Sequence, residues 1–295
     1  MEGTMTCEGV AMTGQVIVGA DGSAPATAAV AWAADDAART GAGLRIVYAL
    51  ERLPHNPVGV AALAQDDLSL CEATKVLEAA EAAARSRQPA VPVVTEIAEG
   101  PPAAVLEEQT RRAGELVIGN RGMGGFTGAL LGSVTMRVAG RAHCPVVVVR
   151  ADPQEPVGVV AVGVDDSGTC EPALGYAFEQ ARLRHAVLRL IHAWQLPVHA
   201  FAPEIFLDVE ETRAGHHRML SERAAGWAPR YPDVTVVADV QNAHPVAALT
   251  GTACDLLVVG THGRGALGAL FLGSVSRGVL HHARGPVAVI REHEP

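Results

Sequence analysis

Short apolar runs alternate along the chain with longer segments whose apolar residues recur at helical spacing. A short apolar run between turn residues is typical of a strand buried on both faces. Helical spacing over roughly ten residues or more is typical of a helix that covers a sheet. In the first part of the chain this pattern predicts strands at 15–20, 44–50, 91–98, 115–119 and 145–150, and helices at 24–40, 68–87, 102–113 and 132–142. Residues 51–64 contain two prolines and are expected to form a loop.

The same series of predicted elements restarts after residues 151–157, a polar stretch with two prolines that is typical of a linker. The second series consists of strands at 158–164, 187–193, 233–240, 255–260 and 285–290, and helices within 170–185, 203–227, 245–252 and 275–283. Strands that alternate with helices predict a parallel sheet covered on both faces. We therefore expect an α/β protein with two doubly wound domains, at 15–150 and 158–295, preceded by a loose leader at 1–14.

Two glycine-rich loops, at 119–133 and 260–274, share one internal spacing. Each loop has a glycine, two further residues, a second glycine, nine residues and then Gly-Ser. Each follows a predicted strand and leads into a predicted helix. Backbone N–H groups and the positive end of a helix dipole therefore meet at one point, which favours an anion such as a phosphate. A single glycine-rich loop can be a plain structural connection, but two copies with the same spacing favour binding.

An acidic residue follows the first predicted strand of each series, Asp21 in one and Asp165 in the other. Ligands of doubly wound sheets bind at the carboxyl ends of the strands, where the direction of winding reverses. If the first and fourth strands are neighbours at that point, Asp21 faces the loop that begins at Gly119, and Asp165 faces the loop that begins at Gly260. The alternative is that each aspartate forms a turn or caps a helix.

Three matched elements give the chain a resemblance to a known family. They are Val-Gly-x-Asp-x-Ser at 18–23 and 162–167, the duplicated glycine signature, and the closing strands at 144–149 and 285–290, which begin with Cys-Pro and Gly-Pro. With these motifs the chain resembles a tandem-domain universal stress protein. The resemblance implies an adenine nucleotide alpha-hydrolase-like fold, with a five-stranded parallel sheet in the order 3-2-1-4-5 in each half. It also implies an ATP site in each half, with ATP bound together with Mg²⁺.

The resemblance further implies which residues contact the nucleotide. In the first half these are Ala20, Asp21, Ala49, Gly119, Gly122, Gly132, Ser133, Val134 and Thr135. In the second half they are Val164, Asp165, Ala193, Gly260, Gly263, Gly273, Ser274, Val275 and Ser276. Neither loop holds a lysine, so the phosphate charge has to be balanced by arginines or by a metal ion. The candidate arginines are Arg121, Arg137, Arg264 and Arg277.

The sequence offers little support for catalysis. It contains no Walker loop, no nucleophile elbow and no His-Glu-x-x-His motif, so we expect neither a catalytic residue nor a metal site built by the protein alone. Phosphoryl transfer needs a group that positions the nucleophile and stabilises charge. We therefore expect an ATP-binding stress-response or regulatory protein with little or no turnover. A slow ATPase and a purely structural interaction module are the alternatives.

Composition and charge narrow the classes of partner. The formal net charge of −9 argues against nucleic acid or an anionic membrane as a partner. No apolar run approaches the roughly 18 residues that a membrane span needs, and residues 1–14 lack the features of a secretory signal. The five cysteines are scattered and include no C-x-x-C pair, which is typical of reduced thiols in a cytoplasmic protein.

The closing strands, 145–149 and 286–290, are apolar and would lie at the edges of the two predicted sheets. Exposed apolar edges tend to pair with other strands. We therefore expect the two closing strands to pair with one another, either within the chain or across a homodimer.

Overall fold

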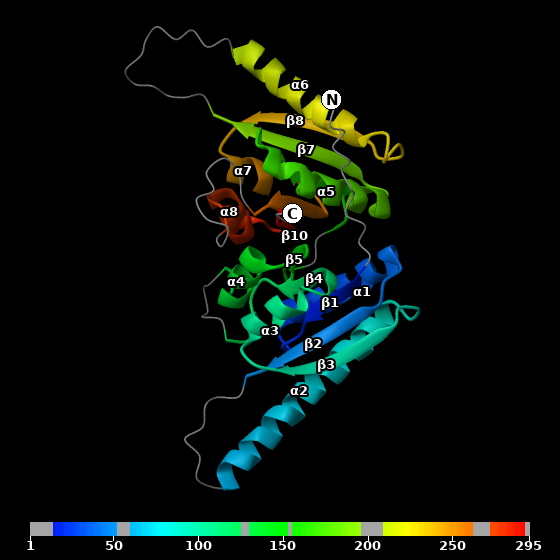
Figure 1. Ribbon diagram of the computed structural model, residues 1–295, viewed down its shortest axis with the longest axis vertical. Helices are drawn as coiled ribbons and strands as arrows, with labels where there is room; N and C mark the ends of the chain where they lie inside the picture. The colour runs from blue at the N-terminus through cyan, green and yellow to red at the C-terminus, as the bar shows by residue number, and fades with distance from the viewer. Residues whose placement is uncertain are drawn as a thin grey trace, which may run out of the picture.

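The computed structural model describes residues 14–51, 60–124, 130–152, 155–195, 209–261 and 272–292. Within these ranges, strands and helices alternate in two successive series, and the two halves lie one above the other (Figure 1). The strands are β1 (Gln15–Gly19), β2 (Leu44–Leu50), β3 (Val93–Glu99), β4 (Ala113–Gly119), β5 (Val146–Val149), β6 (Val159–Gly163), β7 (Val187–Trp194), β8 (Val236–Asn242), β9 (Leu256–Gly260) and β10 (Val287–Ile290). The helices are α1 (Ala24–Thr40), α2 (Val60–Arg87), α3 (Pro102–Gln109), α4 (Ser133–Arg141), η1 (Gly168–Cys170, a 3₁₀ turn), α5 (Glu171–Arg184), α6 (Val209–Trp227), α7 (Pro245–Thr250) and α8 (Ser274–His282).

All ten strands form one sheet in the order β3-β2-β1-β4-β5-β10-β9-β6-β7-β8. Each half has the expected parallel order 3-2-1-4-5, because β1 lies between β2 and β4, and β6 lies between β7 and β9. The two five-stranded sheets are continuous. The halves are joined through β5 and β10, which pair antiparallel.

The join between the halves is symmetric in position. Val147 lies opposite Ala288, and these residues occupy equivalent places in the two halves, since 288 − 147 = 141 is also the offset between the glycine loops. Every residue of β5 and β10 is buried. The closing strands therefore pair within the chain, which was one of the two expected arrangements. Strands β3 and β8 are the outer strands of the sheet. A homodimer through β5 or β10 would have to displace this pairing.

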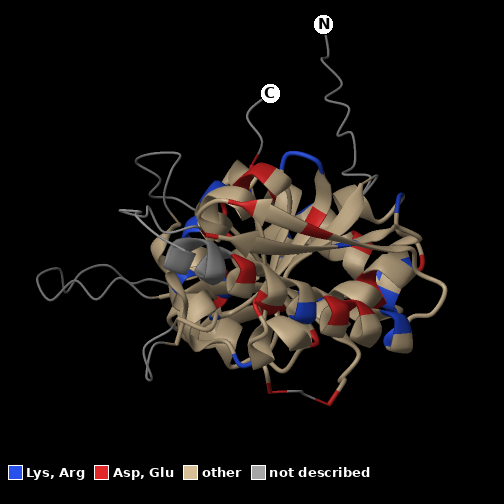
Figure 2. Ribbon diagram, turned by 90° about the horizontal axis from the view of Figure 1, so that it is seen from below, with Lys and Arg blue, Asp and Glu red and all other residues tan. Residues whose placement is uncertain are grey.

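Helices cover both faces of the sheet, and each face has its own apolar core. Helices α1, α2, α5 and α6 pack on one face, where Ala33, Leu77 and Leu174 are buried. Helices α3, α4, α7 and α8 pack on the other, where Val138 and Val279 are buried. Burying a Val or Leu side chain stabilises the fold by about 1.5–3 kcal/mol. Charged residues lie mainly on helices and loops, and most of the strand ribbon is uncharged (Figure 2).

Helix ends follow the sequence signals in some places and depart from them in others. Ser23 caps α1 by accepting a hydrogen bond from the backbone N–H of Ala26 at 3.3 Å, and Gly41 ends the helix with a φ of 69°. The loop predicted at 51–64 is wrong for its last residues, because α2 already begins at Val60, where Val-Ala-Ala-Leu-Ala contains strong helix formers. The helix predicted at 102–113 ends at Gln109, and β4 follows.

The remaining boundary differences are small. Strands predicted at 91–98 and 233–240 are observed as β3 and β8, shifted by two or three residues at their starts. The helix predicted within 203–227 is observed from Val209 onward, and 203–208 lies outside the described residues. Within the described part of the chain, no helix is both long and apolar enough to cross a membrane.

A buried polar cluster joins α1 and β4 of the first half to α5 of the second. Arg184 donates a hydrogen bond to Asp36 Oδ1 at 2.6 Å, and Gln180 Nε2 donates to Asp36 Oδ2 at 3.3 Å. Tyr176 donates its hydroxyl to Glu115 Oε2 at 2.7 Å. Burial raises the pKa of Glu115 well above its ordinary value, and the negative charge of Asp36 raises it further, which favours the protonated carboxyl.

The cluster is unequal across the join. Gln180 is the counterpart of Asp36 in the second half, since 180 − 36 = 144 is also the offset between Asp21 and Asp165. Equivalent positions therefore meet across the join as an acid and an amide.

Candidate functional site

The sequence-predicted residues of the first half come together at the carboxyl ends of the strands. They lie directly after β1 (Ala20 and Asp21), near the end of β2 (Ala49), at the end of β4 and in the loop after it (Gly119 and Gly122), and around the start of α4 (Gly132, Ser133, Val134 and Thr135). One contact joins the turn after β1 to the loop after β4. Asp21 Oδ2 accepts a hydrogen bond from the backbone N–H of Met123, 102 residues away, at 3.0 Å.

Asp21 both forms a local turn and contacts the glycine loop. Its Oδ1 accepts a hydrogen bond from the backbone N–H of Ser23 at 3.0 Å, which is the local turn role. Its Oδ2 holds the glycine loop through Met123, which is the role across the crevice. The aspartate therefore links the turn after β1 to the loop after β4.

The glycines allow these close approaches. A Cβ on Gly122 would lie 2.4 Å from Asp21 Oδ2, and a Cβ on Gly119 would lie 2.9 Å from Cβ of Pro25. Gly119 is thus needed for β4 to pack against the start of α1, which is a structural reason. Gly122 is needed because a larger residue there would collide with the Asp21 carboxylate. Gly124 differs, because an added Cβ there meets nothing within 4 Å among the described residues.

The loop is closed at its base by its own polar groups. The N–H of Gly132 donates to the carbonyl of Asn120 at 2.8 Å, and Asn120 Nδ2 donates to the carbonyl of Leu130 at 3.1 Å. Thr135 donates its hydroxyl to the carbonyl of Gly119 at 2.9 Å, so this side chain holds the loop. Gly132 is the N-cap of α4 and provides no side-chain cap, so the start of the helix presents its backbone N–H groups.

Sequence reasoning missed Tyr48 beside this site. Burial raises the pKa of Tyr48, and the negative charges of Glu72 and Asp21 raise it further. Tyr48 precedes Ala49 on β2. Its position in an apolar strand gives no sequence signal of a role at the crevice.

The second half repeats the arrangement of the loop. Its candidates lie directly after β6 (Val164 and Asp165), in β7 (Ala193), at the end of β9 (Gly260) and around the start of α8 (Gly273, Ser274, Val275 and Ser276). Ser276 donates its hydroxyl to the carbonyl of Gly260 at 2.5 Å, as Thr135 does to the carbonyl of Gly119. Gly263 and Arg264 lie outside the described residues.

The acidic turn differs between the halves. Asp165 Oδ1 accepts hydrogen bonds from the backbone N–H of Ser167 at 3.1 Å and from its hydroxyl at 2.5 Å. The Ser167 hydroxyl also lies 2.7 Å from that of Thr169. The carboxylate is therefore held by a more polar turn than that of Asp21.

A buried histidine lies beside the second site. His192 Nδ1 is 2.8 Å from the carbonyl oxygen of Val164, and the residue is 2% exposed. Its ring lies 4.5 Å from that of His216, which in turn lies 5.4 Å from the ring of Trp194. His192 occupies the place that Tyr48 has in the first half, since 192 − 48 = 144. The two candidate sites therefore differ in the aromatic side chain next to them.

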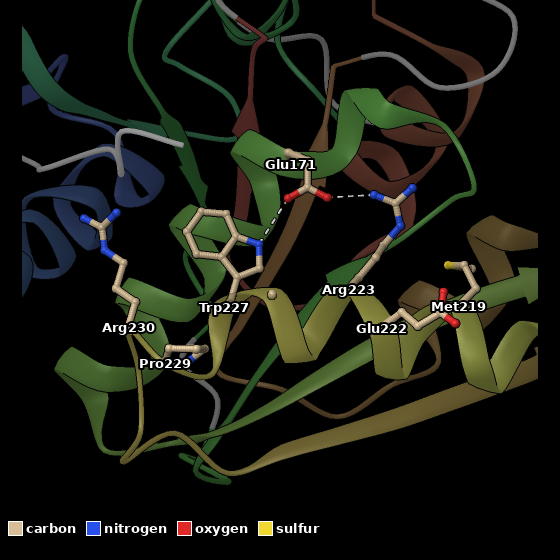
Figure 3. A pocket seen from close by; sticks show the side chains of 8 residues that line it. Glu171, Met219, Glu222, Arg223, Trp227, Pro229 and Arg230 are labelled. Carbon is tan, nitrogen blue, oxygen red and sulfur yellow. Dashed lines mark hydrogen bonds and ion pairs between the residues drawn. The ribbon is translucent and has the colours of Figure 1, made fainter. Parts of the chain in front are cut away.

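A groove of about 660 Å³ lies between α5 and α6, close to the acidic turn of the second half (Figure 3). Glu171 accepts hydrogen bonds from Arg223 at 2.8 Å and from Trp227 Nε1 at 3.1 Å, so one carboxylate orders both side chains. A second nitrogen of Arg223 donates to the carbonyl of Ser167 at 2.9 Å. Arg223 thereby links the groove to the turn that holds Asp165.

Large side chains in the second half replace small ones at this groove. Trp227 and Arg223 are the counterparts of Ala84 and Ala80 in α2, since 227 − 84 = 143 equals the offset between the starts of β3 and β8. Gly175 makes room for the indole, because a Cβ there would lie 2.7 Å from Trp227 Cη2.

Among the described residues, no group of three or more His, Cys, Asp or Glu side chains could hold a metal ion. Burial raises the pKa of Cys144 to about 12 and that of Cys170 to about 11, so both thiols are poor nucleophiles. Arg121 and Arg277 are exposed next to the candidate loops, and Arg137 lies 3.6 Å from Glu107.

Two segments of the chain, residues 12–150 and 157–291, match the model of the Universal stress protein family. The chain belongs to this family. The family model matches twice, so the chain is a tandem member, as the motifs predicted.

Curated relatives and solved structures agree with this membership. A universal stress protein of Mycobacterium tuberculosis (strain H37Rv) is 35% identical over 290 residues, which cover 94% of this chain and 97% of the relative. One of Mycolicibacterium smegmatis is 34% identical over 285 residues, with coverages of 94% and 96%. The crystal structure of a universal stress protein from Archaeoglobus fulgidus has a TM-score of 0.67 at 17% identity, covering 97% of this chain and 99% of that one. The last similarity shows the shared fold.

Proposed function

We propose that the protein binds one ATP molecule in each half and acts as a nucleotide-binding regulatory protein with little or no turnover. The observation that carries the proposal is the contact of Asp21 with the backbone N–H of Met123, which brings the acidic turn and the glycine loop to one crevice. The start of α4, which has no side-chain cap, supplies backbone N–H groups to the same crevice. A cytoplasmic location, where ATP is available, fits this function.

The proposed contacts in each half are those that the family resemblance implies. The backbone after β1 and near the end of β2 would hold the base, Asp21 would lie near the adenine and ribose, and the N–H groups around Gly132 would hold phosphates. In the second half, Asp165 and the N–H groups around Gly273 would have these roles. Thr135 and Ser276 would act through their backbone, because their hydroxyls already donate to carbonyls at the ends of β4 and β9.

The phosphate charge is balanced by arginine and by a metal ion that arrives with the nucleotide. Mg²⁺ is usually held by substrate phosphates, water and one or two protein oxygens, so the absence of a three-ligand metal cluster among the described residues does not conflict with it. The Ser133 and Ser274 hydroxyls at the helix starts are suitable oxygens. The ion would neutralise phosphate charge, and Arg121 and Arg277 would add to this in the two halves.

Equilibrium binding of Mg-ATP to the purified chain, followed by calorimetry, tests the proposal. Gly122→Val should remove one of two binding events, because even its first added carbon would lie 2.4 Å from Asp21 Oδ2. Gly124→Val is the matched control, since an added Cβ at Gly124 has open space among the described residues. Affinity weaker than millimolar, or equal binding by both variants, would contradict the proposal.

The slow ATPase is separated from the regulatory protein by phosphate release. The proposed function expects release at the background rate. Release above background by the purified chain, lost in an Asp165→Ala variant that still binds ATP, would instead establish turnover in the second half.

A further inference from the structure

Two arginines cross the join between the halves in opposite directions. Arg150 directly follows β5 of the first half, and Arg291 directly follows β10 of the second, at equivalent positions since 291 − 150 = 141. Arg150 Nη2 donates to the carbonyl of Leu280 at 2.7 Å and lies 3.4 Å from that of His281, in the last turn of α8. Arg291 Nη1 donates to the carbonyl of Arg141 at 3.3 Å, at the end of α4.

Each arginine therefore holds the far end of a helix whose near end is a candidate phosphate site. Helix α4 begins at Ser133 and α8 begins at Ser274, directly after the Gly-Ser pairs of the two loops. A guanidinium at the C-terminal carbonyls stabilises a helix in the same sense as an anion at its N-terminus. Figure 1 shows α4 and α8 close to β5 and β10, next to the join.

The glycine loops are tied to the same two strands that carry the arginines. The N–H of Asn120, at the start of the first loop, donates to the carbonyl of Val149 at 2.8 Å. The N–H of Thr261, at the start of the second loop, donates to the carbonyl of Ile290 at 2.9 Å. Each loop is thus connected through one residue of a closing strand to the arginine that holds the helix of the other half.

We propose that these connections couple the two nucleotide sites, so that occupancy of one site raises the affinity of the other through Arg150 and Arg291. The proposal rests on the proposed function and adds its regulation. Because each loop is bonded to its own closing strand and the two strands pair with one another, a ligand that fixes one closing strand and the opposite helix leaves less to be ordered by the second ligand.

The charges near the first site also favour a rise in the affinity of the second site when the first is occupied. Burial lowers the pKa of Arg150, and the positive charge of Arg121 lowers it further, so the two guanidinium groups repel one another. Arg121 belongs to the first glycine loop. A phosphate bound there would offset the repulsion and strengthen the hold of Arg150 on α8.

The test measures the affinity of the second site for Mg-ATP with the first site open and with it blocked by Gly122→Val. In the otherwise unchanged chain, blocking should weaken the remaining site by about fivefold or more. In a chain that carries Arg150→Met and Arg291→Met, blocking the first site should change the affinity of the second site by less than about twofold. Arg111→Met is the control, because Arg111, which lies just after α3, is exposed and pairs with Glu108 at 2.9 Å.

The outcomes separate the two proposals. No binding of Mg-ATP by the unchanged chain would refute the proposed function itself. If the unchanged chain shows two binding events and Gly122→Val leaves the affinity of the second site unchanged, the proposed function stands and the coupling is overturned. Coupling that survives in the double arginine variant would overturn the role of the arginines. If circular dichroism shows that the double variant is unfolded, Arg291→Met alone, which removes the 3.3 Å bond to the carbonyl of Arg141, should still reduce the coupling, and undiminished coupling would overturn the proposal.

Discussion

The buried cluster between α1 and α5 gives the sharpest prediction about stability. Asp36 is fully buried, and the side chain of Arg184 is 9% exposed. Arg184 donates to Asp36 at 2.6 Å and to Gln180 Oε1 at 2.9 Å, and its guanidinium lies 4.3 Å from the centre of the Trp32 ring. Replacing Arg184 with methionine keeps much of the volume but leaves the buried carboxylate only Arg39, whose side chain is 31% exposed and donates to Asp36 Oδ1 at 3.2 Å.

The magnitude follows from that burial. Removing one partner of a buried ion pair costs about 3–5 kcal/mol. Because Arg39 still pairs with Asp36, the loss should lie at the lower end, about 3 kcal/mol. With a urea dependence of about 2 kcal/mol per molar, this lowers the unfolding midpoint of Arg184→Met by about 1.5 M. Adding Asp36→Asn should restore at least about half of the lost free energy, because the buried charge is then gone while an amide remains to bond with Gln180.

The assay is urea unfolding followed by circular dichroism, with Arg182→Met as the matched control. Arg182 lies two residues away on α5, but its side chain is 48% exposed and it pairs with Glu179 on the surface. Its removal should cost less than about 1 kcal/mol. A loss below about 1 kcal/mol in Arg184→Met, or no recovery on adding Asp36→Asn, would refute the account of the cluster.

Two further predictions concern single side chains. The pKa of Glu115 is raised in the folded chain, so the folded state holds a proton that the unfolded state has lost, and stability should fall as the pH rises from about 4.5 until Glu115 ionises in the folded state. Glu115→Gln should flatten this dependence in urea unfolding measured across pH, and an unchanged slope would contradict the raised pKa. Gly175→Ala should destabilise the chain by about 1–3 kcal/mol, because the added carbon meets the indole of Trp227 at 2.7 Å. Gly215→Ala, where nothing lies within 4 Å among the described residues, should stabilise α6 by about 0.5–1 kcal/mol, and thermal melts that rank the two variants the other way would contradict the packing argument.

The sequence predicted the features that depend on local signals or on repetition. The spacing of the glycines located both loops, and the position of Asp21 after an apolar strand predicted that it faces the first loop, where it contacts the N–H of Met123. The apolar character of 145–149 and 286–290 predicted that these strands pair. In each case a short stretch of sequence was enough for the prediction. The glycines allow close backbone approach, and an apolar edge strand needs a partner strand.

The features that were not predicted depend on residues far apart in the chain. Asp36 and Arg184 are 148 residues apart, and an acid within an alanine-rich helix resembles a surface residue. The groove at Trp227 also arises from a distant glycine on α5. No local pattern shows such pairs, because burial of a charge or room for an indole is decided by which helices meet.

The asymmetry at the join has a consequence for how the two halves came to be held together. Two separate copies of the first half would bring Asp36 to face Asp36, and two buried like charges would repel one another. Fusion in one chain lets Gln180 stand where the second acid would be. The linker of a few residues also keeps the halves at an effective concentration of about a millimolar or more, so their pairing does not depend on how much protein a cell contains.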